Sequence, residues 1–520
     1  MAETIPGLLA AAADRDAGGT WLRTDDGTLT FAEAAGRVAI TADRLAGAGV
    51  RRGDLVVVTA ATTPPYLLCW LALASLGAVM VPTDPAGTRD ELAGLVGQVR
   101  PRLLVSHAAL LPKVEEALAD GPPPTLDVDA LVGDWRLPAG AGARSVRVDV
   151  APDDLAVLIP TSGTTGRSKL VMQTHRAYAM AGEGFPYWLG LTDEDRLMTS
   201  LPLFHINAPA YSVLGSLACG AGLVLLPRFS PRAFLDAARR HGATEFNAIG
   251  AMLEMLMRQP ARPDDAETGL RLCYTGPSPT REWQEAFEHR FGLRVVCGYA
   301  LSESPYGLIW RHGTRPYGTL GSPRQHPTLG TVNEARVVDD SGHDLTSGRT
   351  GELLLRNPTV TPGYWHPPEE TEATVVDGWL HTGDLVTVNA DGTYTFVSRL
   401  KEVLRRRGQN LSPAEVEDAI LTHPDVLEVA VVAVPSELTE DEVKAFVVPQ
   451  PGRTLDFGAL RAWTAQRLSA FKVPRFWQSV DALPRTATAR VARHRLPVGH
   501  PPGEYDAEAP LPHRETKEGP

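Results

Sequence analysis

The feature that most constrains the fold is an apolar, strand-like run that leads into a loop rich in glycine and hydroxyl side chains. The run covers residues 155–159, and the loop covers residues 161–169, with the sequence Thr-Ser-Gly-Thr-Thr-Gly-Arg-Ser-Lys. Its glycines permit positive φ and close approach of the backbone to a ligand. Backbone N–H groups, hydroxyls and a lysine are the groups that bind the oxygens of a polyphosphate. The sequence therefore predicts a polyphosphate-binding loop at the end of a strand.

This loop differs from a Walker A loop, which requires Gly, four residues, and then Gly-Lys-Ser/Thr. Ser168 stands where the second glycine should be, and Leu170 stands where the Ser or Thr should be. A surface turn rich in Ser, Thr and Gly is the alternative interpretation. The defined spacing of so many positions before one lysine favours the phosphate loop.

Residues 161–169 resemble the phosphate loop of AMP-forming adenylating enzymes, a superfamily of acyl-CoA synthetases, peptide-synthetase adenylation domains and luciferases. Two positions depart from the family pattern, because the usual Pro before the lysine is Ser168 and the usual Gly after it is Leu170. The resemblance continues through the motifs below and covers nearly the whole chain. It implies that Lys169 is catalytic, that Thr161 contributes to the metal site, and that the loop binds ATP through Thr161, Ser162, Gly163, Thr164, Thr165 and Gly166.

Length, charge and cysteine usage set further limits. A chain of 520 residues is long enough for about three folding units. The net charge of −12 argues against a nucleic-acid partner. Cys69, Cys219, Cys273 and Cys297 lie far apart, without metal or disulfide spacing, which fits a reducing cytoplasm. There is no basic signal-peptide region, and the longest apolar run, residues 67–81, is too short to span a bilayer. We expect a cytoplasmic protein without a membrane span; the sequence does not indicate its oligomeric state.

Residues 1–150 alternate helical and strand-like segments. Residues 31–48 are expected to form an amphipathic helix, and residues 54–60, 78–82 and 102–106 are expected to form buried strands. Such alternation is typical of parallel α/β layers. The fold class is therefore α/β, and the resemblance adds a large N-terminal domain of layered α/β subdomains with a small mobile α+β domain after it.

Two further segments belong to the same resemblance. Residues 201–205, Leu-Pro-Leu-Phe-His, resemble the family's aromatic and histidine gate, which implies that His205 is catalytic and lies beside the acyl carboxylate and the ATP phosphates. Taken alone, His205 is better explained as a hydrogen-bonded core histidine. Residues 274–279 are a turn by composition. They resemble the family's glycine-rich segment beside adenine and the acyl pocket, which implies a nucleotide contact at Gly276.

A short apolar strand, residues 295–298, is followed by Tyr-Ala-Leu-Ser-Glu, which resembles the family's Tyr-Gly-x-Thr-Glu motif. The chemistry suits a nucleotide: the aromatic face of Tyr299 for adenine, the hydroxyl of Ser302 for the α-phosphate, and the catalytic carboxylate of Glu303 for Mg²⁺. Ala300 replaces the usual glycine, so we expect an acyl pocket whose floor is one methyl group shallower. A buried strand end with a Ser/Glu cap is the alternative for the motif in isolation.

The resemblance also implies two contacts to the ribose, at positions later in the chain. The Thr-Gly-Asp turn within residues 379–385 resembles the family's ribose-binding motif, and its aspartate is Asp384. A carboxylate only accepts hydrogen bonds, which suits the two hydroxyls of a ribose. Arg399 follows a strand-like segment, residues 394–397, and resembles the second contact to ribose and phosphate.

The same region marks the expected domain boundary. We predict an N-terminal ATP- and substrate-binding domain at residues 1–398, a hinge at residues 399–402, and a swivelling C-terminal domain at residues 403–497. In the family the second residue after the arginine is the pivot, which here is Lys401. Residues 498–520 are rich in Pro, Glu and Gly, and we expect them to be disordered.

Within the small domain, Ser412 followed by Pro413 is typical of a helix start, with Ser at the cap and Pro in the first turn. The triplet Arg405, Arg406 and Arg407 precedes it. This triplet is either a solvated basic patch or a contact to the phosphates of CoA or to the partner domain.

The last motif contains the departure with most consequence. Residues 483–493 align with the family's Pro-Lys-Thr-x-x-Gly-Lys, whose final lysine bridges the acid and ATP; here it is Arg490, after Ala489. A guanidinium keeps the charge, but it is planar where an ammonium is compact. Either Arg490 is a tolerated variant that remains catalytic, or the site activates a different oxyacid.

The resemblance implies an AMP-forming acid–thiol ligase. It would use ATP and Mg²⁺ to convert a carboxylic acid to an acyl-AMP, release pyrophosphate, and transfer the acyl group to CoA. Residues 202–321 look most like crotonobetaine/carnitine–CoA ligases. Arg490 keeps an alternative open: an adenylating ligase with a nitrogen acceptor, which forms an amide or diazotises an aryl amine with nitrite. A non-catalytic nucleotide sensor is disfavoured, because Lys169, Glu303, Asp384 and Arg399 are all present.

Overall fold

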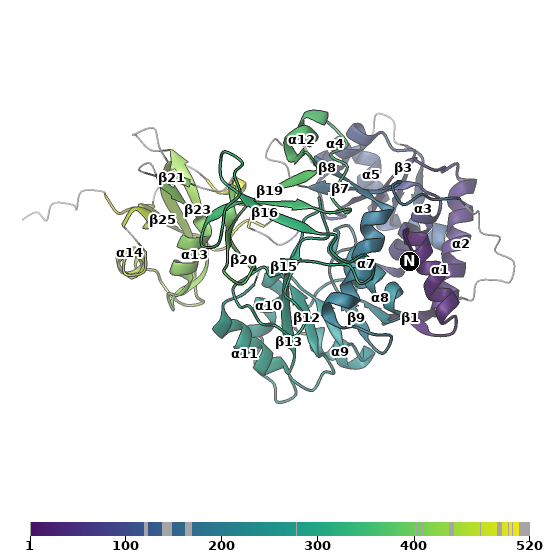
Figure 1. Cartoon of the computed structure of the whole chain (residues 1–520), viewed down its shortest axis with the longest axis horizontal. Coiled ribbons are helices and arrows are strands. Elements are labelled where there is room, and N and C mark those ends of the chain that lie inside the picture. The colour runs from purple at the N-terminus through teal and green to yellow at the C-terminus, as the bar shows by residue number, and fades with distance from the viewer. Residues whose placement is uncertain are drawn as a thin grey trace, which may run out of the picture. The chain divides into compact units, whose positions relative to one another are not determined.

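The computed structural model describes residues 2–118, 123–137, 148–161, 169–276, 278–400, 404–406, 409–435, 441–468, 470–485, 491–497, 499–501 and 503–508. The chain divides into two compact units, which are drawn in Figure 1. Unit 1 comprises Met1–Arg349, Leu353–Thr382 and Val388–Thr395; unit 2 comprises Thr350–Glu352, Gly383–Thr387 and Phe396–Pro520. The predicted pivot, Lys401, lies outside the described residues and stays a prediction.

The first large sheet of unit 1 has six strands in the order β6-β5-β3-β4-β7-β8 among the described residues. All neighbouring pairs are parallel except β7 and β8, which are antiparallel. The strands predicted within residues 54–60, 78–82, 102–106 and 155–159 are confirmed as β3, β4, β5 and β7. The bounds are β3 Leu55–Thr59, β4 Val79–Thr83, β5 Leu103–Ser106, β6 Thr125–Asp127, β7 Leu155–Thr161 and β8 Lys169–Thr174.

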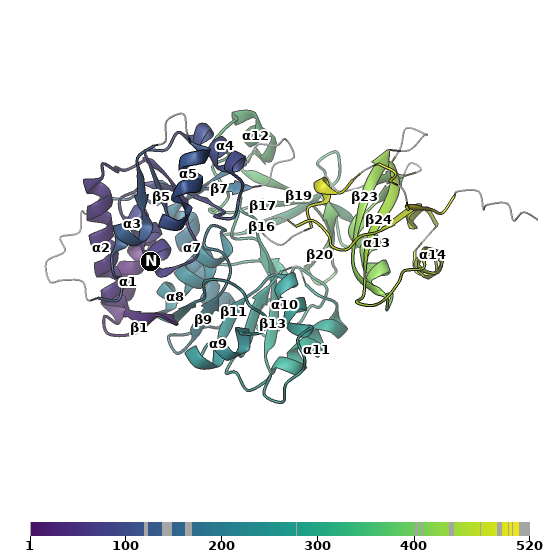
Figure 2. The same cartoon turned by 180° about the vertical axis from the view of Figure 1, so that it is seen from behind.

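Different helices cover the two faces of this sheet. Val57 and Val81 pack in one cluster with Leu95 of α4, whereas Val56 and Val58 on the other face belong to the main core with α3. Because both faces are buried, the strands are continuously apolar. Figures 1 and 2 show α2 and α3 side by side in both views. The predicted amphipathic helix is confirmed as α2, and the bounds are α2 Phe31–Gly47, α3 Pro64–Ser75, α4 Arg89–Val99, η1 Ala108–Leu110, α5 Leu111–Ala117 and α6 Val128–Val132.

The second large sheet of unit 1 has nine strands in the order β15-β14-β13-β12-β11-β9-β10-β1-β2 among the described residues. The strands from β13 to β1 in this order run parallel, so the segments that follow β9, β11, β12 and β13 gather at one edge. The bounds are β1 Thr20–Thr24, β2 Gly27–Thr30, β9 Arg196–Thr199, β10 Gly222–Leu225, β11 Glu245–Asn247, β12 Leu272–Thr275, β13 Arg294–Tyr299, β14 Leu308–Ile309 and β15 Ser322–Pro323.

One continuous hydrophobic core joins the two sheets, with residues from α1, α3, α7 and α8 between them. On the second sheet, the ring of Phe246 in β11 packs against Phe234 of α9, with ring centroids 5.0 Å apart. Figures 1 and 2 show α10 and α11 beside β13 in both views. The bounds are α1 Ile5–Arg15, α7 His175–Leu189, the π-helix η2 Ala208–Val213, α8 Leu214–Cys219, α9 Phe234–His241, α10 Gly250–Met257 and α11 Arg281–Phe291.

A smaller sheet has the order β16-β17-β19-β18, with β20 also paired to β19. The division between the two units falls within its strands β17, β19 and β20. The bounds are β16 Glu334–Val338, β17 Thr350–Arg356, α12 Pro368–Thr374, β18 Val375–Val376, β19 Trp379–Val388 and β20 Tyr394–Arg399.

Unit 2 also contains a four-stranded sheet in the order β23-β24-β25-β26 and the hairpin β21-β22. One face of the four-stranded sheet packs Val431 and Trp477 with Ile420 of α13, and the other buries Phe446 and Leu483. The bounds are β21 Leu404–Arg406, β22 Gln409–Leu411, α13 Pro413–Leu421, β23 Val426–Pro435, β24 Asp441–Pro449, α14 Phe457–Ala465, η4 Ala470–Lys472, β25 Phe476–Ser479, η5 Arg493–Arg495 and β26 Tyr505–Asp506.

Two expectations about this unit need correction. The prediction of disorder throughout residues 498–520 is wrong for residues 505–506, because Tyr505 pairs with Trp477 in the antiparallel ladder of β25 and β26. Helix α13 does begin at Pro413 as predicted, but the hydroxyl of Ser412 donates to the carbonyl of Val397 at 2.9 Å instead of capping the helix. No helix in the described part of the chain is both long and apolar enough to cross a membrane.

Candidate active site

The ends of the predicted phosphate loop are held in register by β7 and β8. Thr161 is the last residue of β7 and pairs with Lys169, the first residue of β8. The hydroxyl of Thr161 donates to the carbonyl of Lys169 at 3.3 Å. The antiparallel pairing thus brings the two ends of the loop together. The predicted loop contacts Ser162, Gly163, Thr164, Thr165 and Gly166 lie outside the described residues.

The Lys169 ammonium already has a carboxylate partner. Its Nζ lies 2.8 Å from Oε2 of Glu370, which belongs to α12, and each of the two side chains is about one quarter exposed. The same Nζ lies 5.1 Å from the centroid of the Tyr364 ring. Both contacts are removable, because a partly exposed ion pair and a cation–π contact are each weak in water.

Tyr364 also binds the carboxylate of Glu303. Its hydroxyl donates to Oε1 of Glu303 at 2.8 Å, so one aromatic side chain contacts both Lys169 and Glu303. Burial, together with the negative charge of Glu303, raises the pKa of Tyr364 far above its ordinary value. The phenol therefore stays protonated and donates to Glu303. The structure thus brings together two predicted catalytic residues that are 134 positions apart in the chain.

The backbone around Glu303 is held by the strand that starts at Lys169. The amide of Gln173, which is fully buried in β8, donates to the carbonyl of Ser302 at 2.6 Å. The N–H of Thr361 donates to the carbonyl of Glu303 at 2.7 Å, and the Thr361 hydroxyl donates to Met172 of β8 at 2.6 Å. Ser302 and Glu303 are therefore positioned by the phosphate-loop strand itself.

Gly276 directly follows β12, and Tyr299 is the last residue of β13, the parallel strand beside it. A Cβ atom at Gly276 would lie 2.3 Å from the carbonyl oxygen of Gly298, so only glycine permits this approach of β12 to β13. Tyr299 is partly buried. His205 lies in the turn beyond β9, at the same edge of the sheet, with its ring centroid 4.6 Å from that of Phe204.

The two predicted ribose contacts form an ion pair within unit 2. Nε of Arg399, the last residue of β20, lies 2.9 Å from Oδ1 of Asp384 in β19. Asp384 is 1% exposed, whereas the Arg399 side chain is 43% exposed. The N–H of Gly383 donates to Glu352 at 3.0 Å, and Gly383 has the positive φ of 68° that favours glycine. The predicted catalytic Arg490 and the predicted pivot Lys401 lie outside the described residues.

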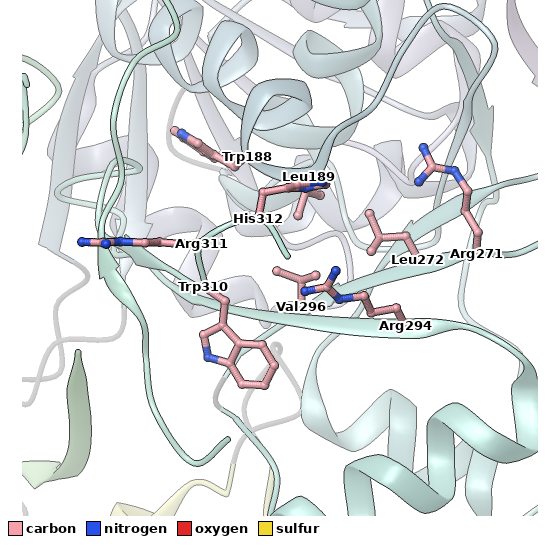
Figure 3. Close-up of a pocket in the computed structure, with 9 residues that line it drawn as sticks. All are labelled: Trp188, Leu189, Arg271, Leu272, Arg294, Val296, Trp310, Arg311 and His312. Atoms are coloured by element: carbon pink, nitrogen blue, oxygen red, sulfur yellow. The ribbon is translucent and has the colours of Figure 1, made fainter. Parts of the chain in front are cut away.

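A separate cavity of about 90 Å³ lies at the amino ends of β12 and β13, away from the predicted site residues. Figure 3 shows Arg271 and Arg311 extending to opposite sides of it, with Arg294 beside Val296. Arg271 forms an ion pair with Asp195, with Nη2 and Oδ2 2.6 Å apart. The cavity therefore shares no residue with the predicted site.

Sequence reasoning did not identify Gln173, Tyr364 and Glu370 as parts of this site. Tyr364 follows Gly363 in a segment that resembles no catalytic motif by residue type, and Glu370 lies in an acidic stretch of ordinary appearance. Only the pairing of β8 with this segment, through a bridge between Val171 and Tyr364, reveals them. Among the described residues, no three His, Cys, Asp or Glu side chains are grouped to hold a metal ion.

Comparison with known proteins places this geometry in one family. Residues 9–365 match the AMP-binding enzyme family, and residues 415–490 match the AMP-binding enzyme C-terminal domain. The crotonobetaine/carnitine–CoA ligase of Salmonella paratyphi B is 32% identical over 476 residues, which cover 88% of this chain and 90% of the relative.

Two solved structures have the same fold. ATP-bound MatB from Rhodopseudomonas palustris superposes with a TM-score of 0.86 at 27% identity, covering 95% of this chain and 98% of that one. O-succinylbenzoate coenzyme A synthetase, MenE, from Bacillus subtilis, in complex with ATP and a magnesium ion, superposes with a TM-score of 0.82 at 26% identity, covering 94% and 98%. The chain therefore belongs to the AMP-binding enzyme family and is an AMP-forming ligase of the acyl-CoA synthetase type.

Proposed function

We propose that this protein is an acid–thiol ligase that uses MgATP to activate a carboxylic acid as its acyl-AMP and then transfers the acyl group to CoA. The observation that carries this proposal is the joint contact of Tyr364 with Lys169 and Glu303. The ammonium of Lys169 and the carboxylate of Glu303, which suits Mg²⁺, both contact Tyr364 beside the predicted phosphate loop. That combination serves the transfer of an adenylyl group from a polyphosphate.

In the first step, an oxygen of the acid attacks the α-phosphorus of ATP, and the bond to pyrophosphate breaks. The nucleophile is already an anion, so the protein must position it and neutralise charge on the phosphates. We assign the neutralising charge to Lys169 and the acid side of the reaction to His205 and Arg490. Gly276, Tyr299 and Ser302 bind the adenine and α-phosphate at the carboxyl edge of the sheet.

The residues present fit a magnesium ion held between protein and nucleotide. Oε1 of Glu303 accepts from Tyr364, and among the described residues Oε2 has no hydrogen-bond partner, which leaves a hard anionic ligand for the metal. Mg²⁺ in such sites takes one or two protein oxygens and completes its shell with phosphates and water. Glu303 and the Thr161 hydroxyl would hold the ion, which supplies charge neutralisation on the phosphates when bound.

Asp384 and Arg399 are proposed to bind the ribose, with Lys401 as the pivot between the two half-reactions. Asp384 is buried and already accepts from Arg399, so its orientation is set before a nucleotide arrives. A hinge changes backbone torsions at one or a few residues. Lys401→Pro, which restricts φ, should therefore slow one half-reaction more than the other. Wild-type single-turnover rates of both half-reactions in that variant would exclude Lys401 as the pivot.

The decisive experiment separates the products of ATP. Purified protein is incubated with MgATP and a panel of acids, with and without CoA, and nucleotides are resolved by chromatography. The panel includes crotonobetaine, carnitine and o-succinylbenzoate, because two similar proteins are named for ligases of these acids. We expect AMP and pyrophosphate, with acyl-CoA only when CoA is present. ADP with orthophosphate would overturn the adenylation chemistry.

A second candidate is an adenylating ligase with a nitrogen acceptor, and the observation that favours it is Arg490 in place of the usual lysine. A planar guanidinium binds an oxyanion through two parallel hydrogen bonds, whereas an ammonium acts as a point charge. In this alternative the protein forms an amide or diazotises an aryl amine with activated nitrite. AMP release that depends on nitrite and an aryl amine, and is independent of CoA, would select it.

A further inference from the structure

Arg324 is a fully buried cation in unit 1 that the reaction chemistry above does not use. It follows β15 directly, its side chain is 0% exposed, and it is among the largest fully buried side chains of the protein. Within the described residues, no carboxylate lies within ion-pair distance of its guanidinium. A buried charge without a counter-charge is costly unless its hydrogens are all engaged.

Aromatic side chains enclose this guanidinium. Its carbon lies 4.7 Å from the ring centroid of Trp188, 5.1 Å from that of Tyr211 and 5.5 Å from that of Tyr274. The hydroxyl of Tyr211 accepts from Nη1 at 2.8 Å, and the hydroxyl of Tyr274 accepts a short hydrogen bond from Nη2. The negative faces of the rings and the two phenol oxygens replace the missing carboxylate.

Two further guanidinium hydrogen bonds of Arg324 reach the backbone just after Glu303. Nη1 donates to the carbonyl of Pro305 at 3.0 Å, and Nε donates to that of Leu308 at 3.1 Å. The backbone N–H of Arg324 donates to the carbonyl of Gly307 at 3.0 Å. Three carbonyls within four residues are thus held by one side chain and its own main chain.

The same guanidinium also packs against the strand that ends at Tyr299. A Cβ atom at Gly298 would lie 2.8 Å from Nη2 of Arg324, so this position must be glycine for the arginine to fit. The nucleotide segment, residues 299–303, therefore has Arg324 against the residue before it and against the residues after it. The Arg324 side chain therefore contacts the chain on both sides of this short segment.

We propose that Arg324 is the positioning residue for the nucleotide segment, residues 299–303, and that it sets where the Glu303 carboxylate meets the metal and the phosphates. This role rests on the proposed function, because it concerns the MgATP site of that reaction. A planar group with five donors satisfies several fixed carbonyls at once, and a lysine ammonium with three donors lacks that geometry. Arg324 touches no reacting atom; it acts through the backbone of the loop.

The test measures binding of ATP by calorimetry, with and without Mg²⁺ and in the absence of any acid. In wild-type protein we expect Mg²⁺ to strengthen ATP binding. In Arg324→Lys the gain from Mg²⁺ should fall about 10-fold or more, because displacing the loop moves the metal ligand. The metal-free affinity should fall by a smaller factor, because the same loop carries Tyr299 and Ser302. Tyr211→Phe removes one hydroxyl and keeps the ring, and it should produce a smaller loss of the same kind.

Two controls separate positioning from a general loss of structure. Arg290→Lys alters another arginine that binds several backbone carbonyls, and Tyr66→Phe removes a buried hydroxyl elsewhere in unit 1. Neither should change the gain from Mg²⁺. If Arg324→Lys does not fold, Tyr211→Phe decides the question alone.

A double-mutant cycle with Glu303→Gln gives the sharpest outcome. If Arg324 acts through Glu303, Arg324→Lys should add less than about 3-fold to the effect already caused by Glu303→Gln, since coupled residues are not additive. Full additivity, or an unchanged gain from Mg²⁺ in both Arg324→Lys and Tyr211→Phe, would overturn the positioning role. A wild-type protein whose ATP binding ignores Mg²⁺ would instead count against the proposed function.

Discussion

Lys169 and Arg324 both belong to unit 1, but the fold holds these two cations in opposite ways. Lys169 is about one quarter exposed, lies at a strand end, and has Glu370 at 2.8 Å as a counter-charge. Arg324 is fully buried, and its hydrogens go to phenol oxygens and backbone carbonyls. The partly exposed position of Lys169 suits its proposed role, because a cation near water can exchange a carboxylate for a phosphate.

Arg324, which we propose fixes a backbone segment, is instead buried among hydrogen-bond acceptors and aromatic rings. The difference follows from the chemistry of the two side chains, because an ammonium on a flexible stem adapts to a moving phosphate. A guanidinium presents a rigid set of donors, which suits carbonyls that do not move. The predictions below test each half of this contrast.

The largest effect is expected at Lys169. Lys169→Met keeps much of the side-chain length and removes the charge that we propose neutralises the phosphates. Adenylation should fall by roughly 10²–10³-fold, the scale for losing one preorganised donor in a transition state. The measurement is acid-dependent exchange of pyrophosphate into ATP. Lys113→Met is the control, since Lys113 binds the carbonyl of Pro85 and lies outside the site. Equal rates in the two variants would remove Lys169 from the reaction.

Glu303→Gln tests the carboxylate that shares Tyr364 with Lys169. The amide keeps the shape and the hydrogen bond from Tyr364 but loses the charge that suits Mg²⁺. We expect the Mg²⁺ concentration for half-maximal turnover to rise about 10- to 100-fold, with unchanged unfolding by circular dichroism. Tyr364→Phe, which keeps the carboxylate and loses only the donor, should cause a smaller shift. An unchanged Mg²⁺ requirement would show that Glu303 is no metal ligand.

Glu245 sharpens the comparison, because it is buried without the partners that satisfy Arg324. It lies in β11 at 0% exposure, and within the described residues neither carboxylate oxygen has a hydrogen-bond partner. Burial raises the pKa of Glu245 well above 4.5; the charge of Asp195 raises it further, and Arg271 opposes the shift. The native state therefore keeps a proton that the unfolded chain loses.

Stability from this group is fully present below pH 4.5, the ordinary pKa of the unfolded side chain, and is lost as pH rises toward the native pKa. Glu245→Gln has no proton to lose, so it should remove a slope of up to about 1.4 kcal/mol per pH unit. Reversible urea unfolding between pH 5 and pH 8, with the exposed Glu285→Gln as control, measures it. The same slope in wild type and Glu245→Gln would mean that Glu245 is ionised in the native state.

The smallest effect is expected at Glu370. In the proposed site ATP displaces this carboxylate from Lys169, so Glu370→Gln should strengthen MgATP binding. A partly exposed ion pair contributes only about 0.2–1 kcal/mol, which corresponds to at most about a 5-fold change in affinity. Glu369→Gln is the matched control, because Glu369 is the exposed neighbour on the same helix. Weaker binding in Glu370→Gln would show that this carboxylate assists ATP instead of competing with it.

Local patterns in the sequence predicted a good part of the fold. The apolar runs at β3, β4, β5 and β7 predicted buried strands, because a strand buried on both faces needs continuous apolar residues. The helix α2 was predicted from its amphipathic spacing. At the end of the chain the expectation of disorder was wrong for residues 505–506. A tail rich in Pro and Gly looks disordered, yet Tyr505 pairs with an edge strand that only the folded sheet provides.

For the site, the sequence by itself determined which residue types are predicted to meet the nucleotide: Lys169 after its glycine loop, Glu303 after its tyrosine, and Asp384 in its turn. Only the tertiary structure decided their partners. Tyr364 is 61 positions from Glu303 in the sequence, and Arg324 is 113 positions from Tyr211. No local sequence pattern relates residues so far apart in the chain. The motif residues can be recognised from the sequence because one short loop supplies several contacts to a ligand. Positioning is non-local because it depends on which strands become neighbours when the sheets form.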